Sequence, residues 1–283
     1  MAHNVAQTAH CQAQGKIGSG FDVASAFFGS HHYVRFNAEH LNRIMESYAS
    51  FKTDPTLYGN MLREMSSKMS TSWLPNFPIP VQLPPGLTMI LGECGKDMNT
   101  PNSVKKVLDW AAREKIAADE LFGNLDSNNQ HIIALLSELN SVNTSSPLSY
   151  LEDVRRCAKV KNIEWKSLSG DSSSKTIGIL IELNNAFNKQ RKYMKTLGEN
   201  AGTPVEPEEI TRILDETERV IPGVLATGAP GAGGYDAVYT ILLDPSLVAQ
   251  TEQLWMHWEE LPMTLLTTEE QPKGVTLKTQ SGH

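Results

Sequence analysis

Residues 223–243 read GVLATGAPGAGGYDAVYTILL, and this stretch sets the architecture expected for the chain. Its two apolar runs, Gly223–Thr227 and Ala237–Leu243, have the composition of buried β-strands. Between them lies Thr227–Asp236, which contains four glycines and is longer than a tight hairpin turn needs. The pattern predicts two neighbouring strands joined by a loop whose backbone N–H groups can surround an anion, with a flexible hairpin turn as the alternative.

This loop lacks the marks of two common nucleotide-binding motifs. No Gly-Lys-Ser/Thr sequence follows its glycines, so it is not a P-loop. No crossover helix with an acidic residue at the required distance follows it either, so it is not a dinucleotide-binding fingerprint.

The rest of the sequence interleaves helices and strands. Thr100-Pro101 supplies a hydroxyl and a proline where a helix begins, and that helix has an apolar face formed by Val104, Val107, Leu108 and Ala111. Apolar residues recur at helical spacing over 176–197, and Gly198 stands where a C-terminal cap is expected. Further helices are expected over 2–14, 21–28, 39–70 (broken at Asp54-Pro55), 117–140, 149–159, 207–220 and 245–258, and further strands over 32–36, 87–91 and 262–277. With the last strands antiparallel, this order predicts an α+β fold.

A proline-rich segment separates two parts of the chain. Five of the fifteen prolines fall within residues 73–86. Because proline fixes φ and removes a backbone donor, we predict an extended connector there. The expected domains are residues 1–83 and 84–283.

A second glycine-rich loop, Gly15–Gly20, lies directly before a predicted helix that contains Asp22. Glycines allow the backbone to approach a ligand closely, and amides at the start of a helix carry partial positive charge. Lys16 adds a full positive charge and Asp22 a carboxylate, a combination that suits phosphate chemistry. A helix–loop–helix turn with an acidic N-terminal residue is the alternative.

Other polar and aromatic residues are weaker candidates for a site. Glu93, Cys94 and Asp97 follow a strand end, but loop carboxylates are usually only solvated. Packing or solvation is the simpler interpretation of the remaining candidates, which are His31, His32, Lys105, Lys106, Trp255 and Trp258.

The composition excludes several classes of protein. Lys and Arg total 25 against 32 Asp and Glu, a formal charge of −7, so no nucleic-acid partner is expected. No apolar run approaches the ~20 residues of a membrane helix, and no signal peptide is recognisable, so no membrane association is expected. Cys11, Cys94 and Cys157 have no metal-ligand spacing, which predicts free thiols in a reducing compartment and no metal site.

The two glycine loops resemble those of a known family. The segments AHCQAQGKIGSGFDVASAFFGSHHYVRF (9–36), PPGLTMILGECGKDMNTPNSVKKVLDW (84–110) and 223–243 resemble phosphomevalonate kinases of the fungal and plant type, within the GHMP kinase superfamily. The similarity runs over essentially all 283 residues. Tyr235-Asp236 after the glycines matches this family better than the wider superfamily.

The resemblance implies a GHMP kinase fold, with part of the N-terminal domain over 1–83 and a ferredoxin-like C-terminal domain with extra helices over 84–283. It implies a cytoplasmic enzyme of the mevalonate route to isoprenoids and sterols. With Mg²⁺, that enzyme transfers the γ-phosphoryl group of ATP to 5-phosphomevalonate. A peroxisomal location stays open, although Ser281-Gly282-His283 is not a peroxisomal signal.

The same resemblance implies roles for individual residues. Asp22 and Lys16 are implied to be catalytic, and Ser19, Gly20, Thr100 and Ser103 to bind substrate. Phosphate groups are implied to lie against Gly231, Ala232, Gly233 and Gly234. Because a phosphate monoester has its second pKa near ~6 and is mostly anionic at neutral pH, Asp22 is expected to orient a lysine, Mg²⁺ or the acceptor rather than to act as an obligatory base.

The resemblance also has a gap. Members of the family carry, ahead of this region, an early lysine motif and a Gly-Leu-Gly-Ser-Ser-Ala motif that surrounds the nucleotide phosphates, and neither occurs in this sequence. We therefore expect the chain to be the later part of such a protein, with a weakly stable N-terminal domain. Two rival interpretations stay open: a non-catalytic remnant that binds a small anion or a partner, and a GHMP kinase with another acceptor.

Overall fold

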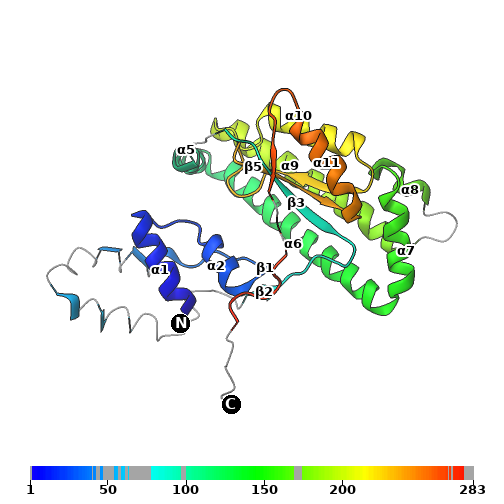
Figure 1. The fold of residues 1–283 in the computed structure, drawn as a ribbon. Helices are drawn as coiled ribbons and strands as arrows, with labels where there is room; N and C mark the ends of the chain where they lie inside the picture. Colours follow the sequence, from blue (N-terminus) through cyan, green and yellow to red (C-terminus); the bar gives the residue numbers. More distant parts are fainter. Residues whose placement is uncertain are drawn as a thin grey trace, which may run out of the picture. The chain divides into compact units, whose positions relative to one another are not determined.

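The computed structural model describes residues 2–39, 41–42, 45–46, 54–56, 59–60, 63, 78–96, 100–168, 174–266, 268 and 270–276. The chain divides into two compact units (Figure 1). The first comprises Met1–Gln82 with Glu270–His283, and the second comprises Leu83–Glu269. Each unit is described by itself.

An antiparallel sheet with the strand order β4-β5-β3-β6 forms the centre of the second unit. Its strands are β3 (Thr88–Glu93), β4 (Val224–Gly228), β5 (Ala237–Leu242) and β6 (Thr264–Leu266). In the register of β3 with β5, Thr88 lies opposite Leu242 and Glu93 opposite Ala237. The predicted strands at 87–91, 223–227 and 237–243 are confirmed, whereas the strand expected over 262–277 is limited to β6 among the described residues.

The helices of this unit pack on the sheet or on one another. They are α5 (Thr100–Arg113), α6 (Lys115–Ser145), α7 (Pro147–Ala158), α8 (Trp165–Leu168), α9 (Lys175–Ala201), α10 (Glu208–Val220) and α11 (Val248–Met256), with 3₁₀ turns at Asn162–Glu164 and Pro245–Leu247. Both α9 and α10 pack against β4, and α9 also packs against α5 and α6. The mixture of helices with an antiparallel sheet confirms the predicted α+β class. No helix within the described ranges is long and apolar enough to cross a membrane.

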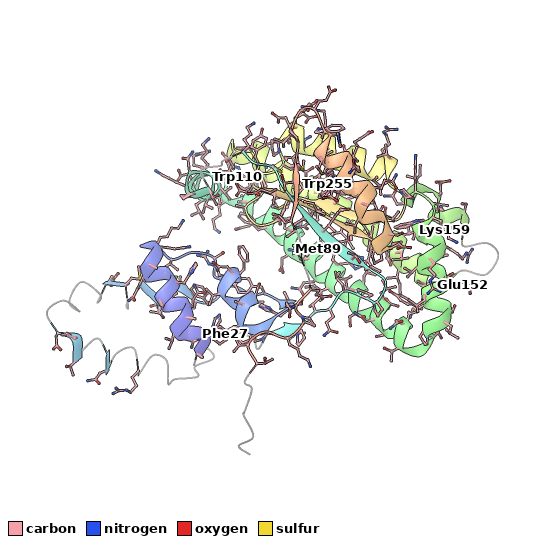
Figure 2. The ribbon with its side chains drawn as sticks, in the orientation of Figure 1. Phe27, Met89, Trp110, Glu152, Lys159 and Trp255 are labelled. Carbon is pink, nitrogen blue, oxygen red and sulfur yellow. The ribbon has the colours of Figure 1, made fainter. Side chains whose placement is uncertain are left out.

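One hydrophobic core of this unit lies between the sheet and the helices α10 and α11. It contains Ile90 of β3, Val238 and Leu242 of β5, and the apolar face of α10. Trp255 of α11 is fully buried (Figure 2), and its indole N–H donates to the Thr217 hydroxyl at 2.9 Å. The packing role predicted for Trp255 is therefore confirmed, and the buried indole nitrogen has the partner that it needs.

The predicted apolar face of α5 is wrong in part. Val104 and Leu108 are 47% and 63% exposed, whereas Ser103 and Trp110 are buried. Trp110 joins a cluster with residues of α6 and α9, and Val107 and Ala111 pack at its edge. The large indole ring fixes which face of the helix turns inward, and Val104 and Leu108 lie outside that face.

The predicted end of the helix over 176–197 is also wrong. α9 continues to Ala201, and its C-cap is Gly202 with φ +64°. Gly198 stays inside the helix, where a Cβ atom would lie 2.8 Å from the carbonyl oxygen of Thr203. Gly198 is thus needed for the close approach of the returning chain and not for a left-handed cap.

The first unit contains α1 (Ala2–Gln14), α2 (Phe21–Phe28) and a two-stranded antiparallel pairing of β1 (His31–His32) with β2 (Ile79–Pro80). Both helices were predicted, but the strand expected over 32–36 is not formed beyond His32. Instead, Tyr33 and Arg35 turn back and donate to the carbonyls of Ser19 and Gly18. The helix expected over 39–70 and the loop residue Asp97 lie largely or wholly outside the described residues.

Gly92 of β3 offers a test of the packing between β3 and Trp255 of α11. A Cβ atom there would lie 2.7 Å from the Trp255 ring, so we expect Gly92→Ala to lower the free energy of unfolding by about 1–3 kcal/mol. Gly123, in α6, has open space around its Cβ position, and Gly123→Ala should raise stability by roughly 0.5–1 kcal/mol. Urea unfolding followed by tryptophan fluorescence measures both variants. Equal effects of the two substitutions would contradict the contact.

Two buried cysteines are expected to make the folded chain less stable at alkaline pH. Cys94 and Cys157 are free and buried, and burial first, then the nearby carboxylates, raises their pKa values from 9.0 to about 11 and about 12. The folded state therefore holds these protons more tightly than the unfolded state. Below pH 9, the protonated thiols contribute fully to the stability of the folded state. Above pH 9, the free energy of unfolding falls by up to about 1.4 kcal/mol per pH unit for each thiol.

Urea midpoints measured from pH 7 to about pH 11 check this slope. Cys94→Ala should make the alkaline decline shallower, and a decline identical to that of the parent chain would contradict the assignment to this thiol. Alkylation by iodoacetamide at pH 8 should be slow in the folded chain and fast in urea.

Candidate functional site

The loop between β4 and β5 is shaped by its glycines. Gly231, Gly233 and Gly234 have φ values of +67°, +73° and +81°, in the left-handed region that favours glycine. The N–H of Gly233 donates to the carbonyl of Pro230 at 3.1 Å, which closes a tight turn within the loop. Within the described ranges, no acceptor lies on the N–H of Gly231 or Ala232. These two amides are thus available to an anion.

The far side of the loop rests on the connector between α9 and α10. The N–H of Gly234 donates to the carbonyl of Val205 at 2.8 Å. A Cβ atom on Gly233 would lie only 2.1 Å from that same carbonyl oxygen. Glycine is therefore required at 233 both for its φ angle and for the space that it leaves. These contacts favour a fixed loop over the flexible turn that was the alternative.

A lysine and a tyrosine lie at the end of this loop. The Tyr235 hydroxyl donates to Glu209 Oε2 at 2.9 Å, and Lys96 Nζ lies 3.8 Å from the centroid of the Tyr235 ring. Burial, followed by the bond to Glu209, raises the pKa of Tyr235, so the hydroxyl remains a donor. Lys96 is exposed and brings a positive charge to the edge of the glycine loop.

Sequence reasoning did not identify Lys96. It named Glu93, Cys94 and Asp97 around that position but did not predict that β3 pairs with β5. In the observed register Glu93 lies opposite Ala237, and the N–H of Cys94 donates to the Asp236 carbonyl at 3.3 Å. That pairing places the residues after β3 beside the glycine loop.

Thr100 and Ser103 lie in the first turn of α5. Ser103 is 8% exposed, and Thr100 is partly buried. Among the described residues, neither side chain forms a hydrogen bond with the glycine loop, so the structure does not join this pair of residues to Gly231–Gly234. α5 is attached to the end of α9 through Lys106, whose Nζ donates to the Gly202 carbonyl at 3.0 Å.

The other predicted site residues lie in the first unit. Gly20 is buried at the start of α2, and a Cβ atom there would lie 2.4 Å from the Phe36 ring. The carbonyl of Ser19 accepts from the Tyr33 hydroxyl at 2.5 Å. Lys16 is exposed, and its backbone N–H donates to the Cys11 carbonyl at 3.2 Å. The loop before Asp22 is thus fastened at several points.

Asp22 lies in the first turn of α2 and has a partner that was not predicted. Its Oδ2 lies 2.9 Å from His10 Nε2, and its Oδ1 accepts from the N–H of Val23 at 2.9 Å. The two side chains of this pair are 35% and 46% exposed. His10 was missed because its contact with Asp22 arises only when α1 packs against α2.

The described residues contain no group of three or more His, Cys, Asp or Glu side chains that could hold a metal ion. The second unit offers backbone amides and a lysine, and the first offers Lys16 and an oriented carboxylate. Such groups suit the binding of phosphate, because donors and cations offset its negative charge.

Two glycine substitutions test the loop geometry. Gly231→Ala places a methyl group in open space and meets only the unfavourable φ, so it should lower stability by about 1 kcal/mol. Gly233→Ala also collides with the Val205 carbonyl, and its effect should be at least twice as large. Urea unfolding gives both values, and amide shifts of Val205 and Gly234 report whether the contact is lost. Equal effects would show that the collision is unimportant.

Comparison with solved structures identifies a likeness of fold. The Lin0012 protein from Listeria innocua superposes with a TM-score of 0.52 at 16% sequence identity, over 94% of this chain and 57% of that one. No protein-family model matches the chain.

Curated sequences give a more specific match. The chain is 33% identical over 278 residues to a peroxisomal phosphomevalonate kinase of Arabidopsis thaliana, covering 98% of this chain and 52% of the relative. It is 32% identical over 268 residues to a phosphomevalonate kinase of Aspergillus fumigatus, covering 91% and 46%. For a phosphomevalonate kinase of Candida albicans the values are 29% over 242 residues, covering 86% and 49%. Over nearly its whole length, the chain is therefore related by sequence to the phosphomevalonate kinases, and it spans about half the length of these curated relatives.

Proposed function

We propose that this chain belongs to a phosphomevalonate kinase and serves the transfer of the γ-phosphoryl group of ATP to the phosphate of 5-phosphomevalonate, which gives 5-diphosphomevalonate. The observation that carries the proposal is the fixed glycine loop at 229–236. Its left-handed glycines and available amides suit a phosphate group, and it lies in a chain related to phosphomevalonate kinases throughout.

Within this proposal each unit has a place in a GHMP kinase fold. The expected C-terminal domain of 84–283 corresponds to the second unit, Leu83–Glu269, except that Glu270–His283 belong to the first unit. The second unit is proposed to be the ferredoxin-like domain with extra helices, and residues 1–83 are proposed to belong to the N-terminal domain. The antiparallel strand order β4-β5-β3-β6 with packed helices supports the first assignment. The enzyme is proposed to act in the cytoplasm. The Arabidopsis relative bears a peroxisomal name, so the peroxisome is the alternative location.

The main difficulty of this reaction is to bring two polyanions together. The acceptor phosphate is mostly anionic at neutral pH, since its second pKa is about 6, and needs little help from a base. In the second unit, Lys96 and the N–H groups of Gly231 and Ala232 are proposed to offset the charge of a phosphate group. In the first unit, Lys16 is proposed to do the same. Asp22, held by His10 and by the N–H of Val23, is proposed to orient a cation or the acceptor.

Mg²⁺ fits this arrangement as a companion of ATP. Mg²⁺ is commonly held by substrate phosphates, by water and by one or two carboxylates. Asp22 provides one carboxylate whose side chain is 46% exposed and thus within reach of solvent. When bound, Mg²⁺ would neutralise charge on the transferred phosphoryl group. Thr100, Ser103, Ser19 and Gly20 are proposed to contact the substrates.

The test is ADP formation by the purified chain with Mg-ATP and 5-phosphomevalonate. Acceptor-dependent ADP, with none from mevalonate as acceptor, would show that a nucleotide site forms without the Gly-Leu-Gly-Ser-Ser-Ala motif that the sequence lacks. Asp22→Asn should lower the turnover at least tenfold if its charge orients the reacting groups, and a change of less than a few-fold would contradict that role. A folded chain without turnover, but with affinity for pyrophosphate, would favour the rival interpretation of a non-catalytic remnant.

Lys96 permits a matched comparison in the same assay. Lys96→Gln removes a cation beside the glycine loop and should raise KM for a phosphate substrate roughly tenfold, with a smaller effect on kcat. Lys105→Gln removes an exposed cation on α5 and should change neither parameter. Equal effects of the two variants would mean that Lys96 acts only through the overall charge of the protein.

A further inference from the structure

A buried arginine lies behind the glycine loop. Arg191 of α9 is 9% exposed, and its partner Glu206 is 7% exposed. Arg191 Nη2 donates to Glu206 Oε1 at 2.7 Å, and Nε lies 3.2 and 3.3 Å from the two carboxylate oxygens. The other terminal nitrogen, Nη1, donates to the Thr227 hydroxyl at 3.3 Å. A single guanidinium thus binds two segments.

These two segments support the two ends of the loop. Thr227 lies in β4, the strand that leads into the loop. Glu206 directly follows Val205, whose carbonyl accepts the N–H of Gly234 and leaves no space for a Cβ atom on Gly233. Arg191 therefore connects the strand before the loop with the surface on which its far side rests.

The charges around Arg191 argue against a direct role in binding phosphate. Asp215 Oδ1 lies 2.9 Å from Nη2, and Glu218 Oε1 lies 3.6 Å from Nη1 and accepts from Thr227 at 2.8 Å. With Glu206, three carboxylates face one cation. Burial opposes the charge of Arg191, but the bond and charge of Glu206 outweigh it and raise the pKa of Arg191. The cluster would repel an anion, so its contribution must be structural organisation of the loop.

We propose that Arg191 and Glu206 are positioning residues of the glycine loop, and that their buried pair fixes the separation between β4 and the 203–207 connector at which the loop can hold a polyphosphate group. The identity of that ligand rests on the proposed function, whereas the positioning does not. Arginine suits this task because its planar fork can bind the carboxylate through two nitrogens and still reach Thr227. A lysine would keep the charge but lose that geometry.

The decisive variant is Arg191→Lys, and its control is Arg219→Lys. Arg219 pairs with Glu216 on the exposed face of α10, with its side chain 67% exposed, so the control makes the same substitution in an ion pair far more open to solvent. Amide hydrogen exchange is compared for residues 229–236 and for the buried strands β4 and β5. We expect Arg191→Lys to speed exchange in the loop roughly tenfold or more with little change in the strands, and the control to change neither.

Binding of inorganic pyrophosphate, followed through the amide signals of the glycine-labelled chain, adds a functional measurement. Arg191→Lys should weaken binding by a factor similar to its effect on loop exchange. If exchange in the loop is unchanged, or rises equally in β4 and β5, the positioning role is overturned. If the loop loosens selectively but the parent chain does not bind pyrophosphate, the positioning role stands and the proposed phosphate site fails.

A milder variant keeps the test valid if Arg191→Lys does not fold. Thr227→Val removes the hydroxyl contacted by Nη1 and leaves the pair of Arg191 with Glu206 in place. Exchange should then rise at Gly228 and Gly231, on the β4 side, and less at Gly234, on the Val205 side. Uniform or absent change in this variant would also overturn the proposal.

Discussion

The contact between the Val205 carbonyl and the backbone of Gly233 and Gly234 is the constraint on which the candidate site depends. The carbonyl accepts from the N–H of Gly234 and occupies the space where a side chain on Gly233 would lie. The connector after α9 must therefore be in place before the loop between β4 and β5 can adopt its shape. Gly198 and Gly202 bring the chain out of α9 along the required path. The loop is thus shaped by a segment that precedes it in the sequence.

Most of the buried charge near this loop lies behind it. Available main-chain amides and Lys96 lie at the loop itself, while carboxylates gather around Arg191 behind it. A buried ion pair is weak grounds for stability, because desolvation offsets much of its attraction. The value of Arg191 and Glu206 is better sought in the geometry that they impose. The three carboxylates around Arg191 are thus occupied by the arginine and its neighbours, while Glu209, at the end of the loop, accepts from Tyr235.

Much of the fold could be predicted because periodicity is a local property. The spacing of the apolar residues predicts the helix over 176–197 and the strands around the glycine loop. The errors occur where distant contacts outweigh local signals. Gly198 has the residue type of a helix cap, but glycine is required there because the Thr203 carbonyl approaches closely. Tyr33 and Arg35 have the alternation of a strand, but their side chains donate to the carbonyls of Ser19 and Gly18.

The candidate site was less predictable for the same reason. Glycine-rich motifs mark both loops in the sequence, but His10, Lys96 and Arg191 acquire their partners only in the folded chain. Arg191 meets Glu206 and Thr227 across 15 and 36 residues, and no local pattern encodes that meeting. The roles of Asp22, Lys16 and the loop glycines in the reaction stay predictions.

The two available N–H groups of Gly231 and Ala232, here called the amide cradle, belong to the main chain and do not depend on side-chain identity. Every residue except proline carries the same N–H, so side chains around such a cradle can drift while the cradle persists. Under the proposed function, a lineage could acquire a new acceptor by replacing side chains that contact the substrate, and the loop would still bind phosphate. The glycines with left-handed angles and the buried pair behind them would then change most slowly, because they preserve a shape and not a chemical preference.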